Sequence, residues 1–176
     1  MREEIIATRS IFSGRIVNLK LHTVQLPDGN HGQREIIYHQ GAVAIVALDA
    51  SQHVLLVKQY RLAIDQITYE IPAGLLEPDE APDEAISREL REETGYRPLG
   101  VQALGGVYVA PGYTTEYIHL YTTRGYEYAP LSPDADEFVE ALRIPFTKAL
   151  AMIEQGEIVE AKSVVGLLRV ARHLGI

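Results

Sequence analysis

The sequence predicts a mixed α/β fold, either an α+β arrangement or a mixed α/β sandwich. Strand-like patterns fill most of the first half, one strongly signalled helix follows them, and helical spacing dominates the C-terminal part. A chain of 176 residues with 47% hydrophobic residues is long and apolar enough to bury one sizeable core. Elements in this order are typical of domains that pack helices against a sheet.

The N-terminal segment contains short apolar, β-branched patches at residues 5–7, 16–26 and 35–38. Ser13-Gly14 and the run Pro27-Asp28-Gly29-Asn30 separate the patches, and residues of these types favour tight turns. We therefore expect a small antiparallel sheet at the N-terminus.

Two apolar runs follow, at residues 42–48 and 54–57, with the polar residues 49–52 between them. Their length and apolar character predict a hairpin whose two strands are both buried. A further strand is expected at 67–71, where Pro72-Ala73-Gly74 ends the pattern.

A helix is predicted from about residue 82 to 94. Pro82 suits the first helical position, and the acids Asp83 and Glu84 complement the positive end of the helix dipole. Gly95 suits a left-handed C-terminal cap.

The remainder of the chain predicts two strands, a long loop, a third strand and two helices. The strands at 101–109 and 117–121 flank a loop at 110–116 that is rich in functional side chains. Beyond them we expect an exposed loop at 126–136, a strand at about 138–144, and helices at 145–155 and 161–174.

The most acidic part of the chain is the stretch from Gly74 to Tyr96, which we call the acidic stretch. Its local net charge is −6, against −8 for the whole protein. On the predicted helix, Glu89, Glu92 and Glu93 share one face about 100° wide, although like charges at this spacing cost roughly 0.2–0.5 kcal/mol per pair. A bound hard cation would relieve this repulsion, and Mg²⁺ prefers carboxylate oxygens together with substrate phosphate.

The composition limits the class of partner. A net charge of −8 makes binding to nucleic acids or to membrane surfaces unfavourable, because both need a basic face. No stretch reaches the length of apolar residues that a membrane span needs. The chain has no cysteine, which fits a reducing cytoplasm. We expect a cytoplasmic protein with a small-molecule partner.

The acidic stretch resembles the signature of the Nudix hydrolases, which is a Gly, five residues, a Glu, seven residues and then Arg-Glu-apolar-x-Glu-Glu-x-Gly-apolar. The matching positions are Gly74, Glu80, Arg88, Glu89, Leu90, Glu92, Glu93, Gly95 and Tyr96. The last position departs in part, since tyrosine is only partly apolar. The resemblance implies the α/β/α sandwich of Nudix proteins, with a mixed sheet, and hydrolysis of a nucleoside diphosphate linked to another group.

The resemblance also implies roles for single residues. Glu89 and Glu93 match the usual metal ligands of the family, and Glu92 matches a third or water-mediated ligand. The carbonyl of Ala73 matches a further ligand, and Arg88 matches the arginine that orients a carboxylate. Mg²⁺ is the expected cofactor, with Mn²⁺ as the alternative.

The regions beside the acidic stretch are similar to those of ADP-ribose pyrophosphatases. Pro111, fifteen residues after Tyr96, matches a marker of that group. The resemblance implies that Arg61 contacts phosphate or ribose, for which its planar fork is suited, and that Glu116 contacts ribose. The segments that carry this similarity are 59–61, 70–74 and 111–116.

The N-terminal segment is expected to serve dimerisation. Arg34 and Glu35 resemble a pair that in these enzymes reaches the nucleotide of the partner subunit, which implies an intertwined homodimer. We therefore divide the chain into a dimerisation segment at 1–40 and a Nudix hydrolase domain at 41–176.

The general base is expected outside the acidic stretch, because metal-bound carboxylates keep little basicity. In this subfamily it tends to come from an acidic loop near the C-terminal third, and the matching run is 132–140. Glu137 is the first candidate, followed by Asp136 and Glu140, and Glu92 is the alternative within the acidic stretch.

Three hypotheses about function remain at this point. The first is Mg²⁺-dependent hydrolysis of ADP-ribose to AMP and ribose 5-phosphate. The second keeps the chemistry but takes another nucleoside diphosphate sugar, such as GDP-mannose. The third is a Nudix-like domain that binds a nucleotide without cleaving it. The complete signature disfavours the third, because non-cleaving domains usually carry a degraded one.

Overall fold

The computed structural model describes residues 1–133 and 138–176. The chain divides into two compact units, of which the first contains residues 1–41 and 108–117 and the second contains 42–107 and 118–176. Within the described residues, no helix is long and apolar enough to cross a membrane. Each unit is described by itself below.

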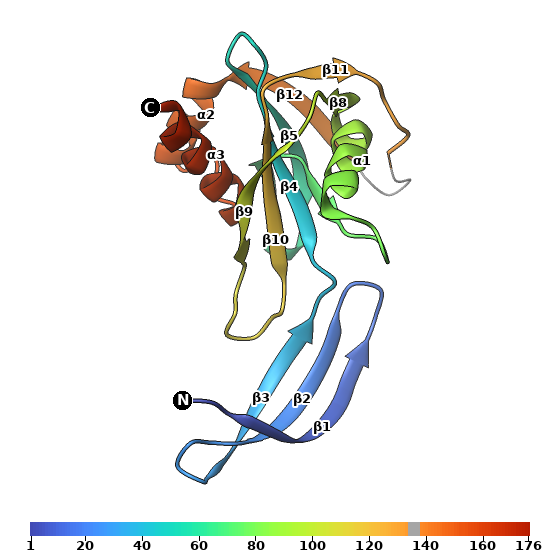
Figure 1. The fold of residues 1–176 in the computed structure, drawn as a ribbon, viewed down its shortest axis with the longest axis vertical. Helices are drawn as coiled ribbons and strands as arrows, with labels where there is room; N and C mark the ends of the chain where they lie inside the picture. The colour runs from blue at the N-terminus through green and yellow to red at the C-terminus, as the bar shows by residue number, and fades with distance from the viewer. Residues whose placement is uncertain (134–137) are drawn as a thin grey trace. The chain divides into compact units, whose positions relative to one another are not determined.

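The first unit is built on a three-stranded antiparallel sheet in the order β1-β2-β3 (Figure 1). Gly29, with a φ of 88°, forms the predicted turn between the second and third strands, where the amide of Leu26 donates to the carbonyl of Asn30 at 2.7 Å. The strands are β1 (Glu4–Ser13), β2 (Asn18–Gln25) and β3 (His31–Tyr38). The predicted N-terminal sheet is present.

The loop at 110–116 belongs to the first unit because it pairs with the end of β3. The amide of Ile37 donates to the carbonyl of Tyr113 at 2.8 Å, and the amide of Thr115 donates to the carbonyl of Ile37 at 2.9 Å. The hydroxyl of Thr115 also accepts the amide of His39 at 2.9 Å. A segment far from the N-terminus in sequence is therefore bridged to the end of β3.

The second unit contains two main sheets, a short strand pair and three helices. One sheet has the order β7-β4-β10-β9 and is mixed, because β4 and β10 are parallel; the other has the order β12-β5-β6 and is antiparallel. The strands are β4 (Ala42–Ala47), β5 (His53–Arg61), β6 (Gln66–Glu70), β7 (Ala73–Leu75), β8 (Tyr96–Pro98), β9 (Gln102–Tyr108), β10 (Tyr117–Thr123), β11 (Tyr126–Tyr128) and β12 (Val139–Pro145).

The helices cover opposite sides of these strands: α1 lies on one side, and α2 and α3 lie on the other (Figure 1). They are α1 (Pro82–Thr94), α2 (Phe146–Glu154) and α3 (Ala161–Leu174), and a 3₁₀ turn, η1, spans Leu62–Ile64. Helix α1 begins at Pro82 and ends at Gly95, whose φ is 79° and whose amide donates to the carbonyl of Arg91. Both ends are where the sequence predicts them.

Strand β4 separates two hydrophobic cores, because successive side chains of a strand point to opposite faces. Val43, Ile45 and Ala47 pack with residues of α1, whereas Ala44 and Val46 pack with residues of α2 and α3. All six residues of β4 are buried. This two-sided burial explains the uninterrupted apolar run, and it confirms the α/β/α sandwich.

The predicted hairpin of the two apolar runs is wrong. Strands β4 and β5 are both buried, but they lie in different sheets and share only the bridge between Leu48 and Val54. Strand β4 pairs with β7 and β10, and β5 pairs with β6 and β12. The apolar pattern predicts burial of each strand, but other strands, among them β6 directly after β5, take the edges that a hairpin would need.

Candidate active site

Helix α1 carries the carboxylates that the sequence places on one face. Glu89 and Glu93 are buried, with 7% and 6% of their surface exposed, and they alternate along the helix with the buried apolar residues Ile86 and Leu90. Glu92 is partly exposed. Burial of two glutamates beside a hydrophobic core is costly unless cations or hydrogen-bond donors surround them.

Arg88 supplies one such cation. It forms ion pairs with Glu80 at 2.9 Å, with Glu89 at 2.7 Å and with Glu92 at 2.9 Å, and its Nη2 donates to the carbonyl of Leu75 at 3.1 Å. The hydrogen bonds to Glu80 are the main cause that raises the pKa of Arg88. The same contact lowers the pKa of Glu80. Three carboxylates therefore share one guanidinium.

The backbone of β7 lies directly against the two buried glutamates. The amide of Ala73 donates to Oε2 of Glu93 at 2.9 Å. A Cβ placed on Gly74 would lie 1.9 Å from the carboxyl carbon of Glu89, so the carboxylate would have to move away from β7. Glycine at position 74 is therefore needed so that the Glu89 carboxylate can approach the strand.

The donors gathered here fit a hard divalent cation. Glu89, Glu92, Glu93 and the backbone of Ala73 offer only oxygen ligands, which suits Mg²⁺ or Mn²⁺. Within residues 1–133 and 138–176, no three carboxylate or imidazole side chains form a ready-made metal cluster. The oxygens of Glu89 and Glu92 point to Arg88 instead, and an oxygen of Glu93 accepts the Ala73 amide.

Arg61 is placed by a cluster that the sequence did not predict. Its Nε and Nη2 donate to the two oxygens of Glu70 at 2.7 and 2.6 Å. The buried Glu70 also accepts hydrogen bonds from Thr68 and from Lys162 of α3. Burial opposes ionisation of Glu70, but these hydrogen bonds and the charge of Lys162 hold its pKa at about 2. We call Arg61, Thr68, Glu70 and Lys162 the Glu70 cluster.

No sequence pattern would have shown this cluster. Glu70 lies in a segment that resembles ADP-ribose pyrophosphatases, but Lys162 lies 92 residues away, in the first turn of another helix. The one unusual local feature is Lys162 itself, because the positive end of a helix disfavours a lysine in the first turn.

The other residues expected to bind substrate lie in the first unit. Arg34 forms an ion pair with Glu3, and Glu35 is exposed on β3. Pro111 is exposed in the loop that pairs with β3, and the amide of Glu116 donates to the hydroxyl of Thr114 at 3.2 Å. Their contacts with a nucleotide remain predictions.

The first candidates for the general base, Glu137 and Asp136, lie outside the described residues. The third, Glu140 on β12, is exposed and forms an ion pair with Lys58 at 3.1 Å. The chain that leads to this acidic run is held at the C-terminal end of α1, where Arg91 donates to the carbonyl of Ala129 at 2.8 Å.

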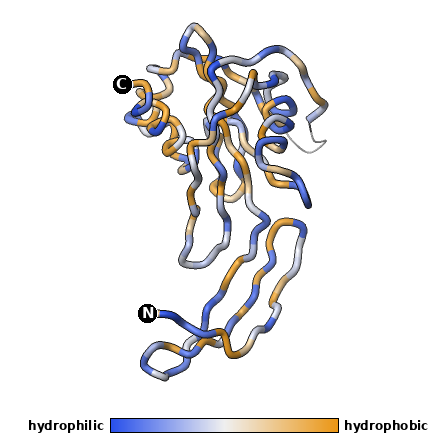
Figure 2. Tube along the Cα trace, viewed as in Figure 1, coloured by the Kyte–Doolittle hydropathy of each residue, from blue (hydrophilic) through white to orange (hydrophobic). Residues whose placement is uncertain are grey.

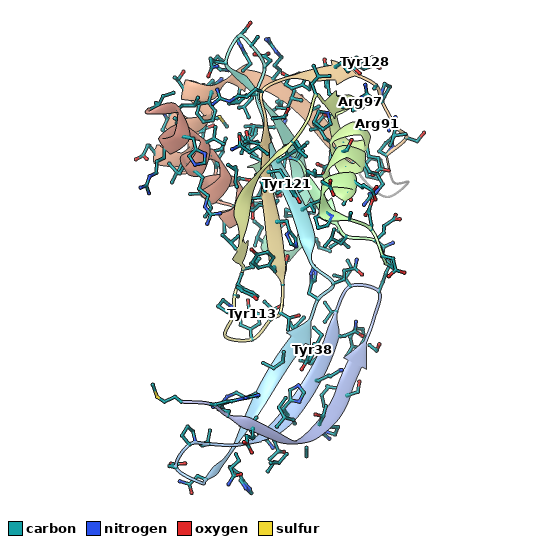
Figure 3. The ribbon with its side chains drawn as sticks, in the orientation of Figure 1. Tyr38, Arg91, Arg97, Tyr113, Tyr121 and Tyr128 are labelled. Atoms are coloured by element: carbon teal, nitrogen blue, oxygen red, sulfur yellow. The ribbon has the colours of Figure 1, made fainter. Side chains whose placement is uncertain are left out.

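A short strand pair supports that arrangement. Strands β8 and β11 pair antiparallel, and the ring of Tyr96 packs edge-on against those of Tyr126 and Tyr128. Figure 3 shows Arg91, Arg97 and Tyr128 at the same end of the second unit. The sequence predicted only an exposed loop here, because three-residue strands leave little periodic signal.

Comparisons with known proteins show the family of the chain. Residues 38–164 match the NUDIX domain family, and residues 3–37 match the nucleoside diphosphate sugar hydrolase N-terminal domain. A methanol dehydrogenase activator of Bacillus methanolicus is 38% identical, over 94% of this chain and 90% of the relative. An ADP-ribose pyrophosphatase of Bacillus subtilis is 36% identical, over 93% of this chain and 89% of the relative.

A GDP-mannose pyrophosphatase of Yersinia enterocolitica is also 36% identical, over 89% of this chain and 90% of the relative. Among solved structures, one described as an ADP compounds hydrolase superposes with a TM-score of 0.90 at 22% identity, covering 99% of this chain and 95% of that chain. The structural likeness shows the fold, which is the sandwich expected from the sequence.

Proposed function

Because the chain belongs to the Nudix family of hydrolases, we propose that it hydrolyses the pyrophosphate bond of ADP-ribose to AMP and ribose 5-phosphate. The observation that carries this proposal is the pair of buried carboxylates, Glu89 and Glu93, packed against the backbone of Ala73 and Gly74. The similarity to an ADP-ribose pyrophosphatase over most of the chain supports the choice of substrate.

Nudix hydrolases generally depend on a divalent metal. Here Glu89, Glu92, Glu93 and the carbonyl of Ala73 would hold Mg²⁺, with Mn²⁺ as the alternative. A bound cation neutralises phosphate oxygens and acidifies water. Arg88 holds Glu89 and Glu92 in place by its ion pairs. Of the two contacts expected for Arg61, phosphate and ribose, we propose the diphosphate, to which its guanidinium would be presented.

The proposed general base is Glu137, with Asp136 and Glu140 as the other candidates and Glu92 as the alternative. Glu137→Gln should lower kcat by about 10²-fold or more while leaving substrate affinity nearly intact, since a neutral isostere removes basicity and keeps shape. Single-turnover rates measure this effect, with Asp136→Asn and Glu140→Gln as matched variants. If all three variants stay active, the base lies elsewhere.

The proposed assembly is a homodimer in the cytoplasm, in which residues 1–40 serve dimerisation and Arg34 and Glu35 complete the site of the partner subunit. Strand β1 is exposed along its whole length and includes Ile5, Ile11 and Phe12, each about half exposed or more. Figure 2 shows hydrophobic stretches along the strands of this unit. A fully active monomer at micromolar concentration in analytical ultracentrifugation would contradict the dimer.

A second candidate substrate is GDP-mannose, which the similarity to a GDP-mannose pyrophosphatase favours. The deciding experiment is phosphate release from a panel of nucleoside diphosphate sugars in a coupled phosphatase assay with Mg²⁺. We expect ADP-ribose to give the highest kcat/KM. A higher kcat/KM for GDP-mannose would make GDP-mannose the proposed substrate. If no compound of the panel yields phosphate, the proposed function is wrong.

A further inference from the structure

The carboxylate of Glu70, at the end of β6, accepts hydrogen bonds from this chain at both of its oxygens. Its Oε1 accepts from Nε of Arg61 at 2.7 Å and from the hydroxyl of Thr68 at 2.6 Å. Its Oε2 accepts from Nη2 of Arg61 at 2.6 Å and from the ammonium of Lys162. Four donors satisfy the two oxygens, so Glu70 has no remaining capacity for a metal or for substrate.

Lys162 reaches Glu70 from an unfavourable position. It lies in the first turn of α3, where the helix dipole opposes a positive charge, and it is 6% exposed. Its ammonium also contacts Glu160, which caps the same helix by accepting the amides of Lys162 and Ser163. A buried cation in this place needs a carboxylate partner, and Glu70 provides it.

The start of α3 is also joined to the chain between Glu70 and the carboxylates of α1. The hydroxyl of Ser163 accepts the amide of Ile71 at 2.9 Å. Two residues later, the amide of Ala73 donates to Glu93. The Glu70 cluster and the α1 carboxylates are therefore connected by three residues of backbone.

Arg61 is the exposed member of the cluster, with 44% of its side chain accessible. Glu70 uses Nε and Nη2, which leaves Nη1 outside these two hydrogen bonds and fixes the plane of the guanidinium. The hydrogen bonds to Glu70 raise the pKa of Arg61, and the charge of Glu93 adds to that shift, so the guanidinium lies within the field of the α1 carboxylates.

We infer that Glu70 and Lys162 are positioning residues that orient Arg61 toward the substrate diphosphate and keep its charge available, without touching the substrate themselves. Lys162, which also contacts Glu160, gives Glu70 a second positive charge, so that Glu70 does not depend on Arg61 alone. The inference rests on the proposed function, because it assigns Arg61 to the diphosphate.

The test is a double-mutant cycle between Lys162 and Arg61. Lys162→Met should raise KM for ADP-ribose about tenfold with kcat within about twofold, and Lys162→Arg should recover most of the loss. In an Arg61→Ala background, Lys162→Met should change KM by less than about twofold, because the group through which it acts is gone. Lys148→Met, at an exposed lysine on α2, is the matched control and should behave as wild type.

Additive KM effects of Lys162→Met and Arg61→Ala, or a lower kcat with unchanged KM, would overturn the inference. If Lys162→Met does not fold, Glu70→Gln in both backgrounds carries the same cycle. A wild-type protein that hydrolyses none of the nucleoside diphosphate sugars would reject the proposed function only. In that event, calorimetric titration with ADP tests the inference. If Lys162→Met weakens ADP binding in the presence of Arg61 but not in the Arg61→Ala background, the positioning role is supported. Unchanged ADP affinity in Lys162→Met contradicts it.

Discussion

Among the described residues of the second unit, buried carboxylates occur in two places, and the chain compensates them differently. Glu70 has two cations, Arg61 and Lys162, within hydrogen-bonding distance. At α1, Arg88 is shared by three carboxylates, Glu80 just before the helix and Glu89 and Glu92 on it. A carboxylate that is ion-paired and fully hydrogen-bonded needs no further ligand. A group of carboxylates that outnumbers its cations is stabilised by binding a further cation.

This difference separates a carboxylate that is already ion-paired from the carboxylates that we propose as metal ligands. Burial alone does not distinguish them, because Glu70, Glu89 and Glu93 are all less than 10% exposed. The local charge balance does distinguish them. The predictions below test that balance, beginning with the α1 carboxylates.

Removal of divalent metal should have the largest effect. In excess EDTA the hydrolysis rate should fall to background, because the α1 carboxylates alone would repel a diphosphate. Mg²⁺ should also raise Tm, since a ligand that binds only the folded state stabilises it. Activity in EDTA equal to that with Mg²⁺ would contradict the proposed metal site on α1.

Glu93→Gln should lower kcat by roughly 10²-fold or more, because it removes a charge that holds the metal against the developing transition state. The Mg²⁺-induced rise in Tm should shrink in the same variant. Glu84→Gln, at an exposed glutamate in the first turn of α1, is the matched control. Near wild-type kcat in Glu93→Gln would show that the α1 carboxylates are not the site.

Gly74→Ala should lower kcat/KM by about 10-fold to 10²-fold, because the added Cβ would displace the Glu89 carboxylate, and small misplacements of catalytic groups are costly. Gly125→Ala is the control, since a Cβ there meets its nearest atom, on Leu99, at an ordinary 3.4 Å. Equal activity of the two variants would mean that the close approach of Glu89 to β7 is not needed.

The smallest effect concerns stability at low pH. The pKa of Glu70 is lowered from 4.5 to about 2, so its ionised form stabilises the fold above pH 4.5, and this contribution is lost as the pH falls toward 2. Urea unfolding of wild type and Glu70→Gln should differ more at pH 6 than at pH 3, and an equal difference at both would contradict the assignment.

Several features of the protein follow from local sequence alone. Pro82 and Gly95 bound α1, because helix ends depend on the conformation of single residues. The spacing of Glu89, Glu92 and Glu93 places them on one face, because the helical repeat is fixed. The apolar run of β4 predicts its burial, because a strand covered on both faces has no polar positions.

Other features depend on which distant segments meet. Strands β4 and β5 are adjacent in sequence but belong to different sheets, since each finds its partners elsewhere in the chain. The contact between Glu70 and Lys162 spans 92 residues and has no periodic signal. Local rules describe a residue's own backbone and neighbours, whereas strand partners and buried ion pairs depend on how the whole core packs. Only the tertiary structure could therefore show which buried carboxylates already have their cations.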